Sequence, residues 1–122
     1  MIKVVAFLTR LPGVDREAFK AYYENNHVPM IEKLLPMLGG GYERNYPDVS
    51  KVRPAEGQSL DEAVGFDALT VMRFKDRDDY NAWKAAIRDP ETLRKIQEDE
   101  ARFLDNTKTR MFVMDERASG PR

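Results

Sequence analysis

The chain has 122 residues, 42% hydrophobic and 34% charged, a size and composition that predict one globular domain. Its 20 basic and 21 acidic side chains give a net charge of -1, which argues against a nucleic-acid surface because such surfaces need concentrated positive charge. With no cysteine and a single histidine, disulfides, thiol catalysis and zinc or iron sites with two histidines are excluded.

No segment approaches the roughly 20 apolar residues of a membrane-spanning helix. The apolar run at residues 4–8 is too short for the core of a signal peptide. We therefore expect a cytoplasmic protein that binds neither membrane nor nucleic acid. Because no phosphate loop, dinucleotide fingerprint or metal motif is present, we expect no cofactor and no metal.

The first half of the chain predicts a strand, a helix and a second strand. Residues 2–9 are apolar and rich in β-branched side chains, and a Pro-Gly turn follows them. Asp15 is the expected N-cap of the helix, and Pro29 predicts a kink or break at residues 26–28. Residues 42–46 form the second predicted strand. The helix carries an apolar stripe at helical spacing, made of Phe19, Tyr23, Asn26, Met30 and Leu34.

The second half begins with a polar connection over residues 48–65, which is either a mobile solvent loop or a lid over a pocket. Residues 66–74 then predict a third strand. A helix starts at Asp76 and restarts at Asp89-Pro90, because an aspartate N-cap followed by proline is typical of a helix start. Leu93, Ile96, Phe103 and Leu104 are expected to face inward. Residues 110–115 predict the last strand.

This β-α-β-β-α-β order, with a split second helix, predicts an α+β fold of ferredoxin-like type with one four-stranded antiparallel sheet and helices on one face. We expect a single domain over residues 1–116 and a flexible tail over residues 117–122. The face opposite the helices would expose a large apolar patch. Two such sheets closing face to face would form a dimeric α+β barrel, so we expect a homodimer with a cavity in each half.

His27 is the leading candidate for chemistry, because imidazole is the only side chain whose unperturbed pKa permits acid and base roles near neutral pH. A histidine at a helix kink can equally be a surface or packing residue. Tyr22 and Tyr23 lie within one turn of it and are candidates for substrate binding, although ordinary packing is the competing interpretation.

Three further candidates come from the strands. Asp67 and Arg73 share one face of the third strand, and they would be polar groups in an otherwise apolar pocket if that face lines the cavity. Phe7, on the first strand, is expected on the same side. Solvation at the sheet edge is the competing interpretation for the two charged residues.

The chain resembles the EthD family of the dimeric α+β barrel superfamily over nearly its whole length. The resemblance rests on three segments: MIKVVAFLTRLPGVDREAFKAYYENNHVPMIEKLLP, FDALTVMRFKDRDDYNAW and DEARFLDNTKTRMFVMDE. The first is the most specific, with its Pro-Gly turn, Phe-x-x-Tyr-Tyr pattern and His-x-Pro step. Residues 39–65 match least.

The resemblance implies the dimeric barrel and implies that His27 lines the cavity. Members and close relatives are linked to ether degradation, to dehydration, decarboxylation or oxidation of aromatic polyketides, and to muconolactone isomerisation. The resemblance therefore favours a cofactor-independent enzyme that moves a proton on a small aromatic, lactone or organic-acid compound. A cofactor-free monooxygenase and a non-catalytic small-molecule-binding protein remain alternatives. Haem degradation is disfavoured, because the histidine used by those relatives lies late in the chain.

Overall fold

The computed structural model describes residues 2–121. Its elements, in chain order, are β1 (Ile2–Leu8), α1 (Arg16–Tyr22), the π turn η1 (Tyr23–His27), α2 (Val28–Leu34), the 3-10 turn η2 (Pro36–Leu38), β2 (Tyr42–Asn45), the 3-10 turn η3 (Val49–Lys51), α3 (Leu60–Val64), β3 (Ala68–Phe74), α4 (Arg77–Arg88), α5 (Pro90–Glu100) and β4 (Arg110–Met114).

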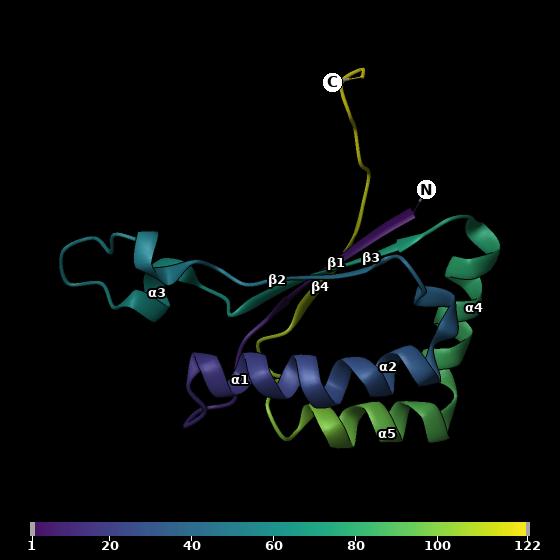
Figure 1. Ribbon diagram of the computed structural model, residues 1–122, viewed down its shortest axis with the longest axis horizontal. Coiled ribbons are helices and arrows are strands. Elements are labelled where there is room, and N and C mark those ends of the chain that lie inside the picture. The colour runs from purple at the N-terminus through teal and green to yellow at the C-terminus, as the bar shows by residue number, and fades with distance from the viewer. Residues whose placement is uncertain (1, 122) are drawn as a thin grey trace.

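The four strands form one antiparallel sheet in the order β2-β3-β1-β4. Helices α1, α2, α4 and α5 lie on one side of this sheet, whereas the C-terminal residues leave on the other side (Figure 1). The predicted ferredoxin-like α+β fold is therefore confirmed. The strands end one or two residues inside the predicted limits, as is usual where pairing frays.

The core lies between the sheet and the helices. Val4, Ala6 and Leu8 of β1 point toward the helices, because side chains alternate along a strand. One cluster packs Ala6 and Leu8 with Phe19 and Tyr23, and a second packs Val4 with residues of α4 and α5. Burial of this apolar surface is the main favourable contribution to folding.

The irregularity predicted beside Pro29 takes the form of the π turn η1, through which the helical path continues without a break. The N–H of Val28 donates to the carbonyl of Tyr23, five residues back, and this wide turn ends just before a proline that has no N–H of its own to donate. The extra residue in the turn shifts the buried stripe by one position. Asn26 is exposed and Met30 and Leu34 are only partly buried. The buried positions between Tyr23 and Leu35 are His27, Val28 and Ile31, and Leu35 itself is buried.

The second helix is split as predicted. Asp76 caps α4 by accepting from the N–H of Asp79, and Asp89 caps α5 by accepting from the N–H of Thr92, with Pro90 in the first turn. Ile96, Phe103 and Leu104 are buried, as expected. Leu93 was also expected to face inward, but it is 36% exposed.

The connection at residues 48–65 is partly structured. Ser59 accepts from the N–H of Glu62 and starts α3, which ends at Gly65 in the left-handed conformation that glycine adopts without strain. This segment projects beyond one end of the sheet (Figure 1).

The sheet face without helices carries both apolar and charged side chains. Val5 and Val71 are buried on it, but Phe112 and Met114 of β4 remain 47% and 45% exposed. Residues 115–121 form no helix or strand, and Arg122 lies outside the described residues. The flexibility expected of residues 117–122 stays a prediction, as do the domain limits.

Replacing Gly41 with alanine should destabilise the fold. A Cβ at Gly41 would meet the backbone oxygen of Arg73 at a distance far inside contact, and the same backbone donates to the Gly41 carbonyl at 2.7 Å. We expect a loss of about 1–3 kcal/mol in the free energy of unfolding, as is typical of overpacking. Urea unfolding measures it, with Gly120→Ala as the control because a Cβ there meets nothing. An unchanged urea midpoint for Gly41→Ala would contradict this packing.

Candidate functional site

His27 is held at the end of the π turn by contacts with helix α5. The side chain is buried, with the residue only 4% exposed, and the ring packs against Phe103 at 5.0 Å between centroids. Its Nδ1 lies 2.7 Å from Oδ2 of Asp99. The other oxygen of that carboxyl group accepts a hydrogen bond from the Tyr22 hydroxyl at 2.6 Å.

The Asp99 contact fixes which ring nitrogen carries the proton. A carboxylate only accepts hydrogen bonds, so Nδ1 of a neutral His27 ring is the donor and Nε2 carries the lone pair. Among the described residues, Nε2 has no hydrogen-bond partner. The pair thus leaves an unprotonated nitrogen free to take a proton.

Burial sets the protonation of His27. Removal of the ring from water lowers its pKa below 6.5, while the hydrogen bond to Asp99 and the charge of Asp99 oppose that shift. The imidazole is therefore neutral at pH 7 and can act as a base. Burial and the Asp99 contact also raise the pKa of the Tyr22 hydroxyl, which keeps it a donor.

Next to His27 lies a cavity of about 190 Å³ between the sheet and the helices. This volume suits a small organic compound rather than a large cofactor. Most of the wall is aliphatic or aromatic, from Ala6, Leu8, Ile31, Leu35, Leu38, Met72, Trp83, Ile87, Leu93, Ile96, Leu104 and Met111. The polar groups on the wall belong to Tyr23, His27, Tyr42, Thr70 and Glu100.

Three of these polar groups form a chain of hydroxyls. Tyr42 donates to the Tyr23 hydroxyl at 3.1 Å, and the Tyr23 hydroxyl lies 2.6 Å from that of Thr70. Burial raises the pKa of both tyrosines, so both remain protonated at pH 7. The chain can donate to a carbonyl or phenol oxygen of a bound molecule.

The structure brings Tyr22, Tyr23 and His27 together but places the other three candidates elsewhere. Phe7 packs against Phe66 and Phe112 on the sheet face without helices. Arg73, on the same face, forms ion pairs with Glu43 and Glu116. Neither lines the His27 cavity, so a role for them in substrate binding stays a prediction.

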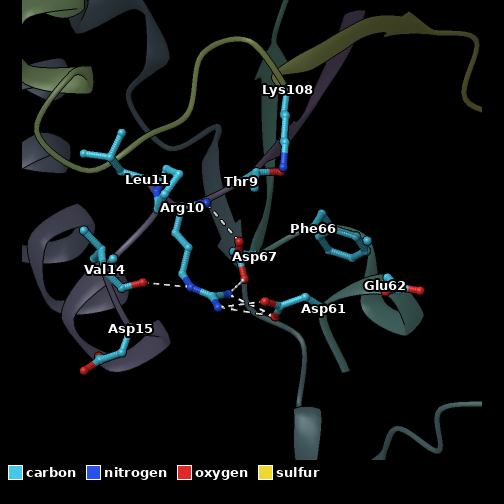
Figure 2. Close-up of a pocket in the computed structure, with 13 residues that line it drawn as sticks. Thr9, Arg10, Leu11, Val14, Asp15, Asp61, Glu62, Phe66, Asp67 and Lys108 are labelled. Atoms are coloured by element: carbon cyan, nitrogen blue, oxygen red, sulfur yellow. Dashed lines mark hydrogen bonds and ion pairs between the residues drawn. The ribbon is translucent and has the colours of Figure 1, made fainter. Parts of the chain in front are cut away.

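Asp67 lies at the end of the sheet near α3. It accepts from the backbone N–H and the guanidinium of Arg10, the latter at 2.6 Å, and Arg10 also contacts Asp61 of α3 (Figure 2). Arg16 approaches the same two carboxylates. These ion pairs account for the burial of Asp67 and fasten α3 to the rest of the fold.

A larger cavity, of about 680 Å³, lies beside this Arg10–Asp67 cluster (Figure 2). Its principal charged groups are already paired with one another, and it contains no imidazole. Within residues 2–121, no three His, Cys, Asp or Glu side chains converge closely enough to hold a metal ion. The His27 cavity is therefore the better candidate for chemistry, although it is the smaller of the two.

Sequence reasoning missed Asp99, Tyr42, Thr70 and Glu100. Asp99 is 72 residues from His27 and stands in the charged run 98–100, which has the appearance of a solvent-exposed helix face. Tyr42 and Thr70 belong to predicted strands, but which face of the sheet they occupy depends on the register. Only the shared cavity, which the sequence does not show, sets Tyr42 and Thr70 apart from the other hydroxyl side chains of the chain.

The fold and site define a small α+β domain that encloses an apolar cavity with one histidine. The EthD domain model matches residues 11–107, and the chain belongs to the EthD family. A comparison with curated proteins found no match.

Solved structures share the fold. An EthD family protein from Bacillus halodurans is 21% identical, with 96% of this chain and 100% of that chain covered and a TM-score of 0.59. HapK from Hahella chejuensis is 13% identical, with 100% and 98% covered and a TM-score of 0.59. At3g17210 from Arabidopsis thaliana is 12% identical, with 99% and 100% covered and a TM-score of 0.62. None of the helices in residues 2–121 has the length and apolar character needed to cross a membrane.

The pKa of His27 should depend on Asp99. In an NMR pH titration of the single histidine ring, we expect a pKa below 6.5 in the wild type and a further decrease in Asp99→Asn, because the variant loses the charge that favours imidazolium. Glu98→Gln removes an equal charge from the same helix at a site paired with Arg94, and should leave the His27 pKa nearly unchanged. A pKa that rises in Asp99→Asn would contradict the assigned pairing.

Proposed function

We propose that this protein is a cofactor-independent enzyme that moves a proton on a small aromatic, lactone or organic-acid compound. The observation that carries the proposal is the buried His27–Asp99 pair, which leaves Nε2 without a partner in the wall of an apolar cavity. A base of this kind supports dehydration, decarboxylation or isomerisation.

The environment of His27 suits this chemistry. Apolar walls exclude water and so strengthen the interaction of a bound substrate with the few polar groups present. The hydroxyls of Tyr23, Tyr42 and Thr70 supply donors for an oxygen that gains negative charge when the base removes a proton. Membership of the EthD family agrees with a small-molecule substrate.

Replacing His27 with alanine should abolish turnover while leaving the fold intact. On a panel of phenolic, lactone and hydroxy-acid compounds, we expect a decrease in kcat of about 10²–10⁴-fold, the usual contribution of a positioned base. Oxygen uptake is recorded in the same assays. Full activity of His27→Ala would refute the mechanism, oxygen consumption with a phenol would favour a monooxygenase, and tight binding without turnover would favour a binding protein.

We further propose that the protein is a homodimer, with a cytoplasmic location that agrees with the absence of cysteine. The support for the dimer is the sheet face without helices. On this face, Phe112 and Met114 of β4 are 47% and 45% exposed, a large apolar exposure for a monomer. A second sheet packed on this face would bury Phe112 and Met114.

Placing a charge on this face should dissociate the dimer. Phe112→Glu puts a carboxylate on the face that carries Val5, whereas Val113→Glu puts the same group on the opposite face of the same strand. Sedimentation velocity should give a dimer for the wild type and Val113→Glu and a monomer for Phe112→Glu. A monomeric wild type would overturn the proposal.

A further inference from the structure

Glu100 is a carboxyl group of the His27 cavity that the mechanism above does not use. It is the last residue of α5 and contributes to the cavity wall together with His27. Adjacent side chains on a helix diverge by about 100°, since there are 3.6 residues per turn. Asp99 therefore binds the ring at Nδ1, while Glu100 is directed to the cavity.

Nothing in the surroundings of Glu100 explains it as a structural residue. Its only hydrogen bond is a long one, 3.5 Å, from the amide of Asn106, and it forms no ion pair with any residue from 2 to 121. Its neighbour Asp99 carries the same charge, and the C-terminal end of a helix disfavours a negative group. A carboxyl group at a position that destabilises its charged form is typical of a functional site.

We propose that Glu100 is the general acid that acts with His27, the general base, on a substrate bound between them. This inference rests on the proposed function and specifies the substrate as a β-hydroxycarbonyl compound. It also identifies the reaction as loss of water.

The proton transfers balance without a further reagent. Nε2 of His27 takes the proton from the carbon next to the carbonyl, and the C–H electron pair becomes the new C=C bond. The C–O bond breaks, and the hydroxyl group takes the proton of Glu100 and leaves as water. The imidazolium then returns its proton to the Glu100 carboxylate, which restores both groups.

The protonation states fit these roles. Burial raises the pKa of Glu100 above 4.5, the charge of Asp99 adds to the increase, and Asn106 opposes it. Burial lowers the pKa of His27. Each shift moves its group toward the neutral form. Four other polar side chains line the cavity that Glu100 lines: Tyr23 and His27 of the π turn, Tyr42 of β2 and Thr70 of β3. Asp99 of its own helix and Asn106 of the loop after α5 also act on its pKa.

An NMR pH titration of the His27 ring tests the placement of Glu100 without a substrate. If the two groups share the cavity, the wild-type ring signals should show a second inflection where Glu100 ionises. Glu100→Gln should abolish this inflection, whereas Glu98→Gln, on the solvent side of the same helix, should leave it in place. A single inflection in the wild type would overturn the proposal.

Stability gives a second readout. A pKa raised on folding stabilises the protein at low pH, and this contribution is lost as the pH rises through the folded-state value. Glu100→Gln should therefore raise Tm at pH 7 and leave it unchanged at pH 4. An unchanged Tm at both pH values would count against a half-buried carboxyl group without an ion pair.

Activity assays distinguish the role proposed for Glu100 from the function proposed for the protein. On a β-hydroxycarbonyl compound, Glu100→Gln should lower kcat by about 10²–10⁴-fold and remove the alkaline limb of the pH profile. If Glu100→Gln keeps wild-type turnover while His27→Ala is inactive, the assignment of Glu100 fails and the proposed function stands. If His27→Ala also keeps full turnover, the proposed function itself fails.

Discussion

The π turn at residues 23–27 decides what the single histidine of this protein can do. In a regular α-helix, with about 100° per residue, the buried stripe through Phe19 and Tyr23 would pass between Asn26 and His27, and His27 would lie at its edge. The wider turn adds one residue before Pro29 and brings His27 onto the inner face, where it meets Asp99. The π turn thus places the ring in the buried stripe, and the contacts with Asp99 and Phe103 fix its orientation.

The sheet divides the molecule into two sides with different roles. On the helix side, β1, β3 and the helices enclose the His27 cavity, with the hydroxyls of Tyr23, Tyr42 and Thr70 in its wall. On the other side, ion pairs of Arg73 and the apolar residues of β4 form an open surface. The cavity is complete within one chain, so the proposed chemistry does not depend on a partner, even though the proposed dimer would cover the open face.

Local signals in the sequence were sufficient for the fold but not for the site. Helix caps and strand propensities depend on only a few neighbouring residues. The elements predicted from the caps at Asp76 and Asp89 and from the β-branched residues of β1 are present. The buried face of β1 could not be chosen, because Val4 and Val5 are equally apolar. Asp99 could not be found either, since it looks like one more surface charge until the fold brings α5 beside the π turn. The histidine itself was predicted from its chemistry and from the resemblance to the EthD family.

The tautomer of His27 tests the central claim, that Asp99 binds Nδ1 and leaves Nε2 as the base. Long-range ¹H–¹⁵N correlation spectra at pH 8, where the ring is neutral, distinguish the protonated from the unprotonated ring nitrogen. The account predicts a proton on Nδ1 and a lone pair on Nε2, and loss of this preference in Asp99→Asn. A ring protonated on Nε2 in the wild type would contradict it, because the nitrogen facing the cavity would then have no lone pair with which to take a proton.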